Sequence, residues 1–228
     1  MLFSRSWREW ATSPALDAAV PLSESKNQRG RVACTARGTT HLEIQRILIN
    51  RSRHARHRVW LATAYFVPSR KIRRELRKAA FRGVDTRLLL PGPITDHPAV
   101  RFASRRFYAR LLRYGVRIYE YSGGFMHAKV ALVDNWCSIG SSNLDRWNLR
   151  WNLEANQEVD DGVFAEEVAD MLNADFRHSS EIDYRLWRQR SGVQRIKEWV
   201  WGKMDIFLAQ FMPADKLEGN KGKDRDAD

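Results

Sequence analysis

The chain has 228 residues, and hydrophobic residues make up 43% of it, so it is long and apolar enough for one domain with appendages and is not wholly disordered. Lys and Arg number 39 against 27 Asp and Glu, and the resulting formal charge of +12 favours an anionic partner such as phospholipid head groups or nucleic acid. The two cysteines, Cys34 and Cys137, exclude a disulfide framework and a cysteine-rich zinc site, and we expect both to be reduced thiols.

Nothing in the sequence indicates a segment for export or for crossing a membrane. Residues 1–10 lack the uninterrupted apolar core of a secretory signal, and no stretch of about 20 apolar residues is present. We therefore expect a cytoplasmic location, peripheral to the inner (cell) membrane.

Hydrophobic periodicity predicts strands and helices that alternate from residue 41 and end in a cluster of strands. Helices are predicted over 41–57, 70–82, 98–114, 161–177 and 182–190, and strands over 59–67, 84–90, 116–121, 128–134, 136–140 and 154–159. This order is typical of an α/β fold, with a mixed β-sheet flanked by helices on both faces.

The segments outside this core differ in composition. Residues 1–40 show no periodicity and predict an irregular N-terminal arm or linker, and the folded domain is predicted over 41–190. Residues 191–212 contain an amphipathic helix that either lies at a membrane interface or docks on protein. Residues 213–228 are charged, poor in apolar groups and predicted to be disordered.

Positive charge is concentrated in the first part of the predicted domain. Residues 41–117 hold 19 Arg and Lys against four Asp and Glu. Part of this charge forms one face of the predicted helix 98–114, made of Arg101, Arg105, Arg106, Arg110 and Arg113. We expect this face to be solvated surface, with head-group or nucleic-acid binding as the alternative.

The stretch from residue 125 to 157 carries the most specific pattern in the chain. His127 and Lys129 are followed by Asp134, and Gly140-Ser-Ser-Asn143 comes shortly afterwards. The pattern His-x-Lys-x4-Asp arises by chance in roughly one or two such chains per hundred, and a Gly-Ser-x-Asn at one fixed distance lowers this about ten-thousandfold.

These residue types suit chemistry on a phosphodiester. Side chains alternate along a strand, so His127 and Lys129 share one face, where the ammonium neutralises an anion while a neutral imidazole nitrogen attacks phosphorus. Ser141 and Asn143 are candidate hydrogen-bond donors to phosphate oxygens. Glu154 is a candidate to accept a hydrogen bond from the second ring nitrogen of His127.

The motif resembles the His-Lys-Asp motif of the phospholipase D superfamily, and the flanking sequence resembles the C-terminal half of bacterial cardiolipin synthases. The flanking similarity includes Ala64-Tyr-Phe-Val-Pro68, Arg82-Gly-Val-Asp85, Leu88-Leu-Leu-Pro-Gly92 and Tyr114-Gly-Val-Arg-Ile-Tyr-Glu-Tyr121. The resemblance covers about residues 41–190.

The resemblance implies a phosphohistidine intermediate and no metal or other cofactor. It assigns the catalytic motif to His127, Lys129 and Asp134, with His127 as nucleophile or acid and Lys129 and Asn143 as phosphate ligands. Asp134 is expected to be a structural partner in this motif. Asp145, just past Asn143, is expected to be a turn or cap residue.

Synthases of this superfamily resemble two fused halves with one motif each, whereas a second His-x-Lys is absent from this sequence. The chain is therefore expected to form a homodimer in which two copies of His127 meet, to pair with a partner half, or to be a truncated remnant. The expected activity is cardiolipin synthase-like phosphatidyl transfer on membrane phospholipids. The alternatives are a homodimeric, metal-independent nuclease and an inactive membrane-binding remnant.

Overall fold

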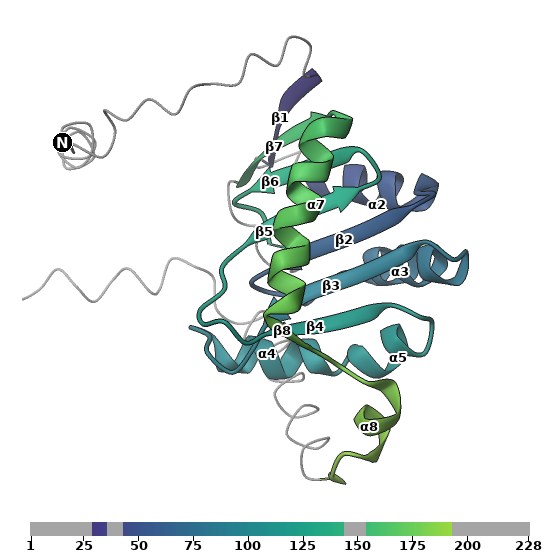
Figure 1. Cartoon of the computed structure of the whole chain (residues 1–228), viewed down its shortest axis with the longest axis vertical. Coiled ribbons are helices and arrows are strands. Elements are labelled where there is room, and N and C mark those ends of the chain that lie inside the picture. The colour runs from purple at the N-terminus through teal and green to yellow at the C-terminus, as the bar shows by residue number, and fades with distance from the viewer. Residues whose placement is uncertain (1–28, 36–42, 144–153, 193–228) are drawn as a thin grey trace, which may run out of the picture.

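The structure is a computed structural model that describes residues 29–35, 43–143 and 154–192 (Figure 1). Beyond residue 192 the predicted amphipathic helix lies outside these residues, and so do the charged tail and Asp145. In the described part both cysteines are free thiols, with Cys34 exposed and Cys137 buried. Burial raises the pKa of the Cys137 thiol to about 12.

The centre of the fold is one mixed sheet of eight strands in the order β1-β7-β6-β5-β2-β3-β4-β8 (Figure 1). The strands are β1 (Arg29–Thr35), β2 (Arg58–Thr63), β3 (Asp85–Pro91), β4 (Arg117–Tyr121), β5 (Lys129–Val133), β6 (Trp136–Gly140), β7 (Glu154–Asp160) and β8 (Ser179–Glu181). The strands β2, β3 and β4 are parallel, and all other neighbours pair antiparallel.

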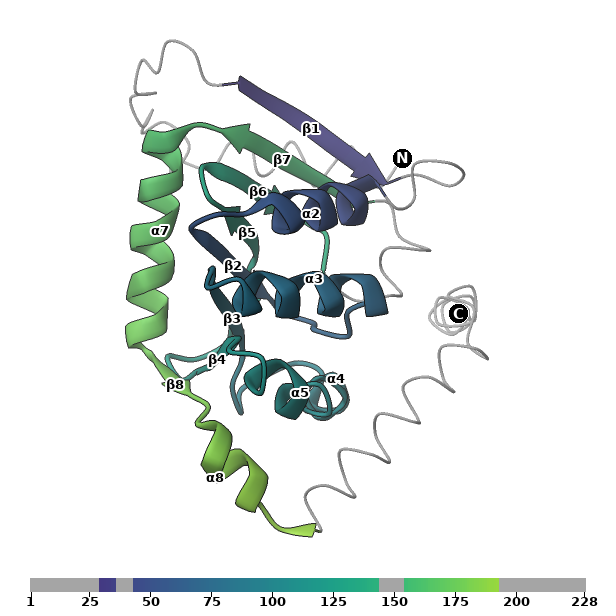
Figure 2. The ribbon, with the colours of Figure 1, turned by 90° about the vertical axis from the view of Figure 1, so that its right-hand side faces the viewer.

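Helices cover both faces of this sheet, so the predicted α/β architecture is confirmed (Figure 2). One face carries α2 (Glu43–His54), α3 (Arg70–Phe81), α4 (Pro98–Arg105) and α5 (Tyr108–Leu112), and the other carries α7 (Gly162–Arg177). The short helix α8 (Tyr184–Gln189) packs beside α5.

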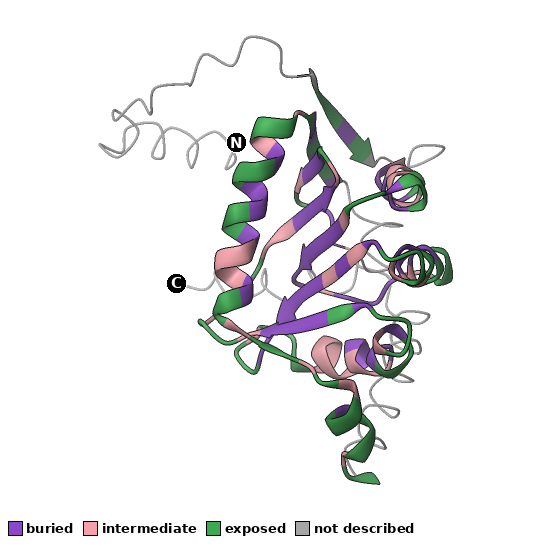
Figure 3. Cartoon of the chain, turned by 45° about the vertical axis from the view of Figure 1, so that its right-hand side comes forward, coloured by how far each residue is buried: buried purple, intermediate pink, exposed green. Residues whose placement is uncertain are grey.

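The core forms two apolar layers, one on each face of the sheet, because consecutive residues of a strand point to opposite faces. In β3, Leu88 and Leu90 pack in the layer beneath α2, α3 and α5, and Leu89 packs in the layer beneath α7. Figure 3 shows the strands buried between helices whose outer sides are exposed. Fully burying one such leucine stabilises the fold by about 2 kcal/mol.

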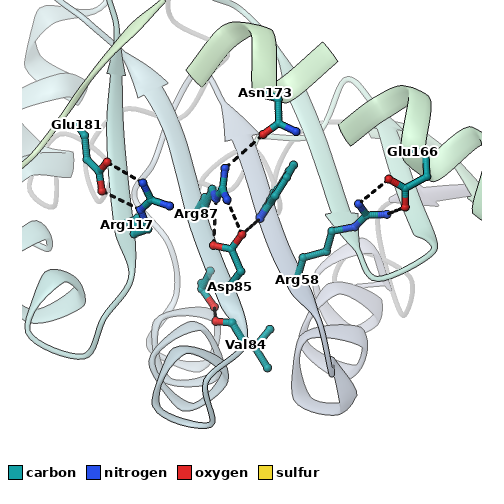
Figure 4. A network of polar contacts seen from close by, with 10 residues as sticks. Arg58, Val84, Asp85, Arg87, Arg117, Glu166, Asn173 and Glu181 are labelled. Carbon is teal, nitrogen blue, oxygen red and sulfur yellow. Dashed lines mark hydrogen bonds and ion pairs between the residues drawn. The ribbon is translucent and has the colours of Figure 1, made fainter. Parts of the chain in front are cut away.

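Polar contacts of arginines hold the edge at which β2, β3 and β4 begin (Figure 4). Arg58 pairs with Glu166 of α7 at 2.7 Å, and Arg117 pairs with Glu181 of β8 at 2.8 Å. Asp85 accepts a hydrogen bond from the Trp60 indole and binds the Arg87 guanidinium, which reaches Asn173 of α7. These contacts fasten α7 and β8 at the edge where β2, β3 and β4 begin. They do not involve the opposite edge, where these three strands end.

The strand β1 corrects the prediction that residues 1–40 are irregular. It pairs antiparallel with β7 over its whole length. Of its central side chains only Ala33 is buried, whereas Val32 and Cys34 are exposed. Backbone hydrogen bonds to β7 define this strand, and its side chains carry no apolar alternation that sequence reading detects. The same holds for β8, a strand of three polar residues that was also missed.

The predicted helix over 98–114 is two helices, α4 and α5, with a turn between them. The N–H of Phe107 bonds to the Ser104 carbonyl, one residue short of the α-helical spacing. The Ser104 hydroxyl also donates to the Val100 carbonyl at 2.8 Å, which competes with the helical ladder. The other predicted helices are confirmed within a few residues, and the strand predicted over 59–67 ends at Thr63.

Part of the basic face expected to be solvated is in fact folded inward. Arg101 and Arg105 bind the buried carboxylate of Glu120 in β4 at 2.7 and 2.9 Å, and the Tyr108 hydroxyl donates to the same carboxylate. Burial acts to raise the pKa of Glu120, but the hydrogen bonds and charges of the two arginines outweigh it and lower the pKa.

We expect Glu120→Gln to lower the free energy of unfolding by about 3 kcal/mol, because it leaves two partly buried guanidinium groups without their counter-charge. The matched control is Glu181→Gln, which breaks the more exposed pair with Arg117 and is expected to cost less than about 1 kcal/mol. Urea unfolding of the two variants measures the difference. Equal losses would contradict the assigned role of Glu120.

Candidate active site

The candidate site residues gather at the edge where β2, β3 and β4 end. Because β5 and β7 run opposite to these strands, β5 and β7 begin at this edge, and β6 ends there. The edge therefore carries the segment after Thr63, the segment before Lys129, the segment after Gly140 and the start of β7 at Glu154. Pairing of strands thus unites residues that lie up to 90 positions apart.

The His127 side chain is exposed just before β5, between two aromatic rings. Its ring meets Tyr65 edge-on at 5.7 Å between centroids and stacks on Phe125 at 5.8 Å with 11° between the planes. The position of Tyr65 follows from strand pairing, because the Ala64 N–H bonds to the Ala128 carbonyl at 3.0 Å and so extends the β2–β5 pairing. The imidazole is thereby oriented and open to solvent.

A carboxylate fixes the tyrosine that orients the imidazole. The Tyr65 hydroxyl donates to Asp96 at 2.6 Å, and the Tyr65 ring also contacts His97. Burial acts to raise the pKa of Asp96, but the Tyr65 hydrogen bond and the positive potential of His97 and His127 outweigh it and lower the pKa. Asp96 is therefore an anion at neutral pH, and it holds Tyr65 in place through a charge-assisted hydrogen bond.

Lys129 is the first residue of β5 and lies opposite Thr63 of β2. Its ammonium group donates to the His127 carbonyl at 3.0 Å, so its head stays at the edge that carries the imidazole. A cavity of about 20 Å³, the size that holds one water, is lined by Lys129, Ser138, Ser142 and Asn156 among others. This shared cavity places the lysine beside the Gly140–Asn143 segment.

Hydrogen bonds to β7 hold the Gly140–Asn143 segment. A Cβ on Gly140 would lie 2.2 Å from the Ala155 carbonyl oxygen, so only glycine allows β7 this close. The Ser141 hydroxyl accepts from the Ala155 N–H at 3.1 Å, and Ser141 is exposed. Asn143 is buried, and its Oδ1 has no hydrogen-bond partner in the part of the chain that the structure describes.

The side-chain amide of Asn156 in β7 holds the Gly140–Asn143 segment through hydrogen bonds. Its side-chain oxygen accepts from the Ser142 N–H at 3.1 Å, and its NH2 group donates to the Ser138 hydroxyl at 2.9 Å. Glu154, two residues earlier, is buried on the same face of β7. The ring contacts of His127 are with Tyr65 and Phe125, so a hydrogen bond from His127 to Glu154 stays a prediction.

Asp134 lies at the other end of β5, roughly 20 Å along the strand from His127. Its carboxylate accepts hydrogen bonds from the backbone N–H groups of Arg56, His57 and Arg58 at 2.9–3.0 Å. Its φ of 51° is in the left-handed region that Asp tolerates better than most residues. Asp134 thus joins the β5–β6 turn to the start of β2 and sets the pairing of the strand that presents His127 and Lys129.

Sequence reading singled out His127, Lys129, Ser141, Asn143 and Glu154, and the fold brings all of them to one edge. It missed the side chains that orient them, above all Tyr65, Asp96, Phe125 and Asn156. The available signal was position, because each of these residues lies in a strand or within about five residues of a strand end at that edge. Asp134, the remaining member of the motif, lies at the opposite edge.

The described residues contain neither a cluster of metal-binding side chains nor a membrane-spanning helix. No group of three or more His, Cys, Asp or Glu side chains in residues 29–35, 43–143 and 154–192 is arranged to hold a metal ion. No helix in the same ranges combines the length and apolar character needed to cross a bilayer.

The family model described as "Cardiolipin synthase, PLD-like domain" matches residues 48–178, which include every site residue named above. The chain belongs to the phospholipase D-like domain family of cardiolipin synthases. Membership explains why the similarity extends from α2 to the end of α7 and is not confined to the His-Lys-Asp motif.

Two curated relatives of this phospholipase D-like domain are bacterial synthases. The chain is 32% identical to minor cardiolipin synthase ClsB of Bacillus subtilis over 184 residues, which are 80% of this chain and 46% of the relative. It is 42% identical to a cardiolipin synthase of Geobacillus kaustophilus over 149 residues, which are 64% of this chain and 29% of the relative. The chain thus spans less than half of the curated relatives it matches.

Solved structures show the same fold at low sequence identity. Nuc of Salmonella typhimurium, a phospholipase D family member, aligns with a TM-score of 0.56 and 17% identity over 68% of this chain and 99% of its own. Phosphatidylserine synthase of Haemophilus influenzae aligns with a TM-score of 0.59 and 13% identity over 79% of this chain and 45% of its own. The phospholipase D-like domain is thus one structural unit that matches nearly all of the first protein and under half of the second.

We expect Asp134→Asn to lower the free energy of unfolding by about 1.5–3 kcal/mol at pH 7, because it removes the charge that accepts three backbone hydrogen bonds. Burial raises the pKa of Asp134, but the N–H groups of Arg58, Arg56 and His57 outweigh it, so the folded-state pKa lies below the ordinary 3.8. The stabilisation is therefore full well above pH 3.8 and is lost as the pH falls through the folded-state pKa.

Urea unfolding between pH 7 and pH 3 tests this pH dependence, with Asp170→Asn on the exposed side of α7 as the control. The difference between the wild type and Asp134→Asn should narrow as the solution becomes acidic. A difference that is constant with pH, or no larger than that of the control, would contradict the role assigned to Asp134.

Proposed function

We propose that this chain supplies one catalytic half, residues 41–190, of an enzyme that transfers phosphatidyl groups between membrane phospholipids, as in cardiolipin synthesis. The observation that carries the proposal is the exposed imidazole of His127, oriented by two aromatic rings, with the ammonium of Lys129 at the same sheet edge. The curated relatives are cardiolipin synthases, which supports phospholipid as the substrate class.

In the first step the unprotonated ring nitrogen of His127 attacks the phosphorus of a phospholipid. A nitrogen–phosphorus bond forms, the bond from phosphorus to the leaving alcohol oxygen breaks, and that oxygen takes a proton from a second imidazolium. For phosphatidylglycerol as donor, the leaving group is glycerol and the intermediate is phosphatidyl-histidine. A reacting phosphodiester needs no metal for these bond changes.

In the second step the hydroxyl of an acceptor alcohol attacks the same phosphorus. The acceptor proton passes to the second imidazole, the nitrogen–phosphorus bond breaks, and His127 returns to its starting state. When the acceptor is phosphatidylglycerol, the product is cardiolipin. Each imidazole thus ends the cycle in the protonation state in which it began.

The other residues of the site bind the phosphate and orient the nucleophile. Lys129 neutralises the charge that accumulates on the non-bridging oxygens, and Asn143 and Ser141 donate hydrogen bonds to them. Removal of one such donor typically costs about 10²–10³ in rate. Glu154 positions His127 by accepting a hydrogen bond from the protonated ring nitrogen, and Asp134 supports the motif from the far edge.

The proposed reaction needs a second imidazole, and this sequence holds one His-x-Lys motif. We propose that the second half-site comes from another copy of the chain or from a partner half with its own motif. The exposure of His127 leaves room for such a partner. A strict monomer in light scattering that is inactive alone would favour the partner half or the truncated remnant.

A metal-independent nuclease remains the second candidate, because residues 41–117 carry a large excess of positive charge. The fold similarity to Nuc does not favour it, since that similarity shows the fold alone. Cleavage of DNA in the presence of a chelator, compared with release of glycerol from phosphatidylglycerol vesicles, separates the two substrates.

We expect His127→Ala to lower transfer by at least about 10³-fold, because it removes the nucleophile. The matched control is His54→Ala, an exposed histidine at the end of α2 whose Nδ1 contacts the Asn50 carbonyl. The control is expected to retain activity within about twofold. The measurement is cardiolipin formed from phosphatidylglycerol in membranes that contain each protein. Unchanged lipid products in the His127→Ala membranes would overturn the proposal.

We also expect the activity per molecule of the purified chain to rise with its concentration, because a site shared between two copies forms only on dimerisation. Light scattering over the same concentration range gives the solution mass. Activity that stays constant per molecule while the mass remains that of a monomer would contradict a shared site.

A further inference from the structure

We propose that the outer face of the helical layer α3–α5 is a docking surface for an anionic phospholipid membrane, separate from the His127 site. Between these helices runs a groove of about 550 Å³, here called the basic groove. Its basic side chains are Arg70, Lys71, Arg73, Arg74, Arg77, Arg106 and Arg110.

No carboxylate occurs among the described lining residues of the basic groove, although Arg74 pairs at 3.0 Å with Glu75, a buried neighbour on α3. The Arg73 guanidinium lies 4.3 Å from the centre of the Phe107 ring, and the Arg106 guanidinium lies 4.5 Å from the same ring. The buried Arg73 Nε has no hydrogen-bond partner in the described part of the chain. An anion with several oxygens would satisfy the Arg73 Nε and neutralise the cluster of like charges around it.

Burial and the crowding of like charges in the basic groove change the pKa of Arg73. Burial, followed by the repulsion of Arg106, Arg77, Arg110 and Arg70, lowers the pKa of Arg73 to about 10. Such a cluster destabilises the isolated fold and would repel the same surface of a second copy, so an anionic partner is the occupant that its charge fits.

Exposed aromatic side chains at one end of the groove favour a membrane over a nucleic acid. Phe81 is 81% exposed, and helical spacing places it on the face of α3 that carries Arg77. The Arg77 guanidinium lies 5.1 Å from the Tyr114 ring, which is 40% exposed. A membrane interface takes phosphates on arginines and aromatic rings at the head-group level. A single-stranded nucleic acid needs rings spaced along the basic track, whereas helical spacing and the ring contact place both of these rings next to one arginine, Arg77.

The test is sedimentation of the whole chain with vesicles of phosphatidylcholine alone or mixed with phosphatidylglycerol. The triple variant Arg70→Glu, Lys71→Glu, Arg110→Glu changes exposed residues of the groove. Its binding to the mixed vesicles is expected to fall about 100-fold, since each basic residue at an anionic surface contributes several-fold. The control, Arg46→Glu, Arg56→Glu, Arg177→Glu, makes the same charge change on exposed residues elsewhere and is expected to lose far less.

A second variant tests the aromatic end without changing charge. Phe81→Ala is expected to weaken binding to the mixed vesicles about fivefold, because it removes apolar surface from the interface. Its control is Val163→Ala, which truncates an exposed apolar side chain on α7, at 73% exposure, and should leave binding unchanged. Binding by the wild type is also expected to weaken as salt is raised.

Two results would overturn the proposal. One is an equal loss for the groove and control triple variants, which would reduce the effect to net charge. The other is tight binding to single-stranded DNA with no binding to phosphatidylglycerol vesicles, which would make the groove a nucleic-acid site. His127→Ala is expected to bind vesicles like the wild type, so failure of the catalytic proposal leaves this one standing.

Discussion

The antiparallel pairing of β5 with β2 is the interaction on which the site depends. It places Lys129 opposite Thr63, and one further hydrogen bond, from Ala64 to Ala128, brings His127 beside Tyr65. Asp134 sets this pairing from the far edge, because it binds the backbone at the start of β2. If the pairing of β5 with β2 shifted by one residue, the side chains of His127 and Lys129 would turn to the face of the sheet that α7 covers. The three members of the motif are therefore joined by one strand register, although only two of them lie at the same edge.

The sequence predicted the regular elements well wherever burial produced periodicity. The strands β2 to β7 and the helices α2, α3 and α7 bury one or both faces, and their apolar patterns show it. The edge strand β1 buries little more than Ala33, so its existence depends on backbone pairing with β7 and left no pattern to read. The break between α4 and α5 is a turn in which the Phe107 N–H bonds to the Ser104 carbonyl, and apolar periodicity does not reveal such a local change of hydrogen bonding.

The sequence predicted the residues that we propose as the reacting groups of the site, but it did not predict the side chains that support them. The spacing of His127 and Lys129 and the Gly140–Asn143 segment indicated phosphodiester chemistry because their chemical types and distances are unusual together. Tyr65 and Asn156 act through contacts that exist only after distant strands pair, so no local pattern marks them. The pairing of charged side chains also depends on contacts that form only in the folded chain, so the sequence did not predict it. Arg101 and Arg105 resembled solvated arginines, yet they bind Glu120, while the basic groove beside α3 gathers seven basic side chains and no carboxylate in its lining.

The central claim is that the His127 imidazole forms a covalent bond to phosphorus. Its most direct test is to mix the protein with phosphatidylglycerol, quench within the first turnovers, and search its peptides by mass spectrometry for a phosphatidyl adduct. The account predicts an acid-labile adduct on the peptide that contains His127, discharged when an acceptor alcohol is added. Product formation with no adduct on that peptide, or with the adduct on another residue, would contradict the account.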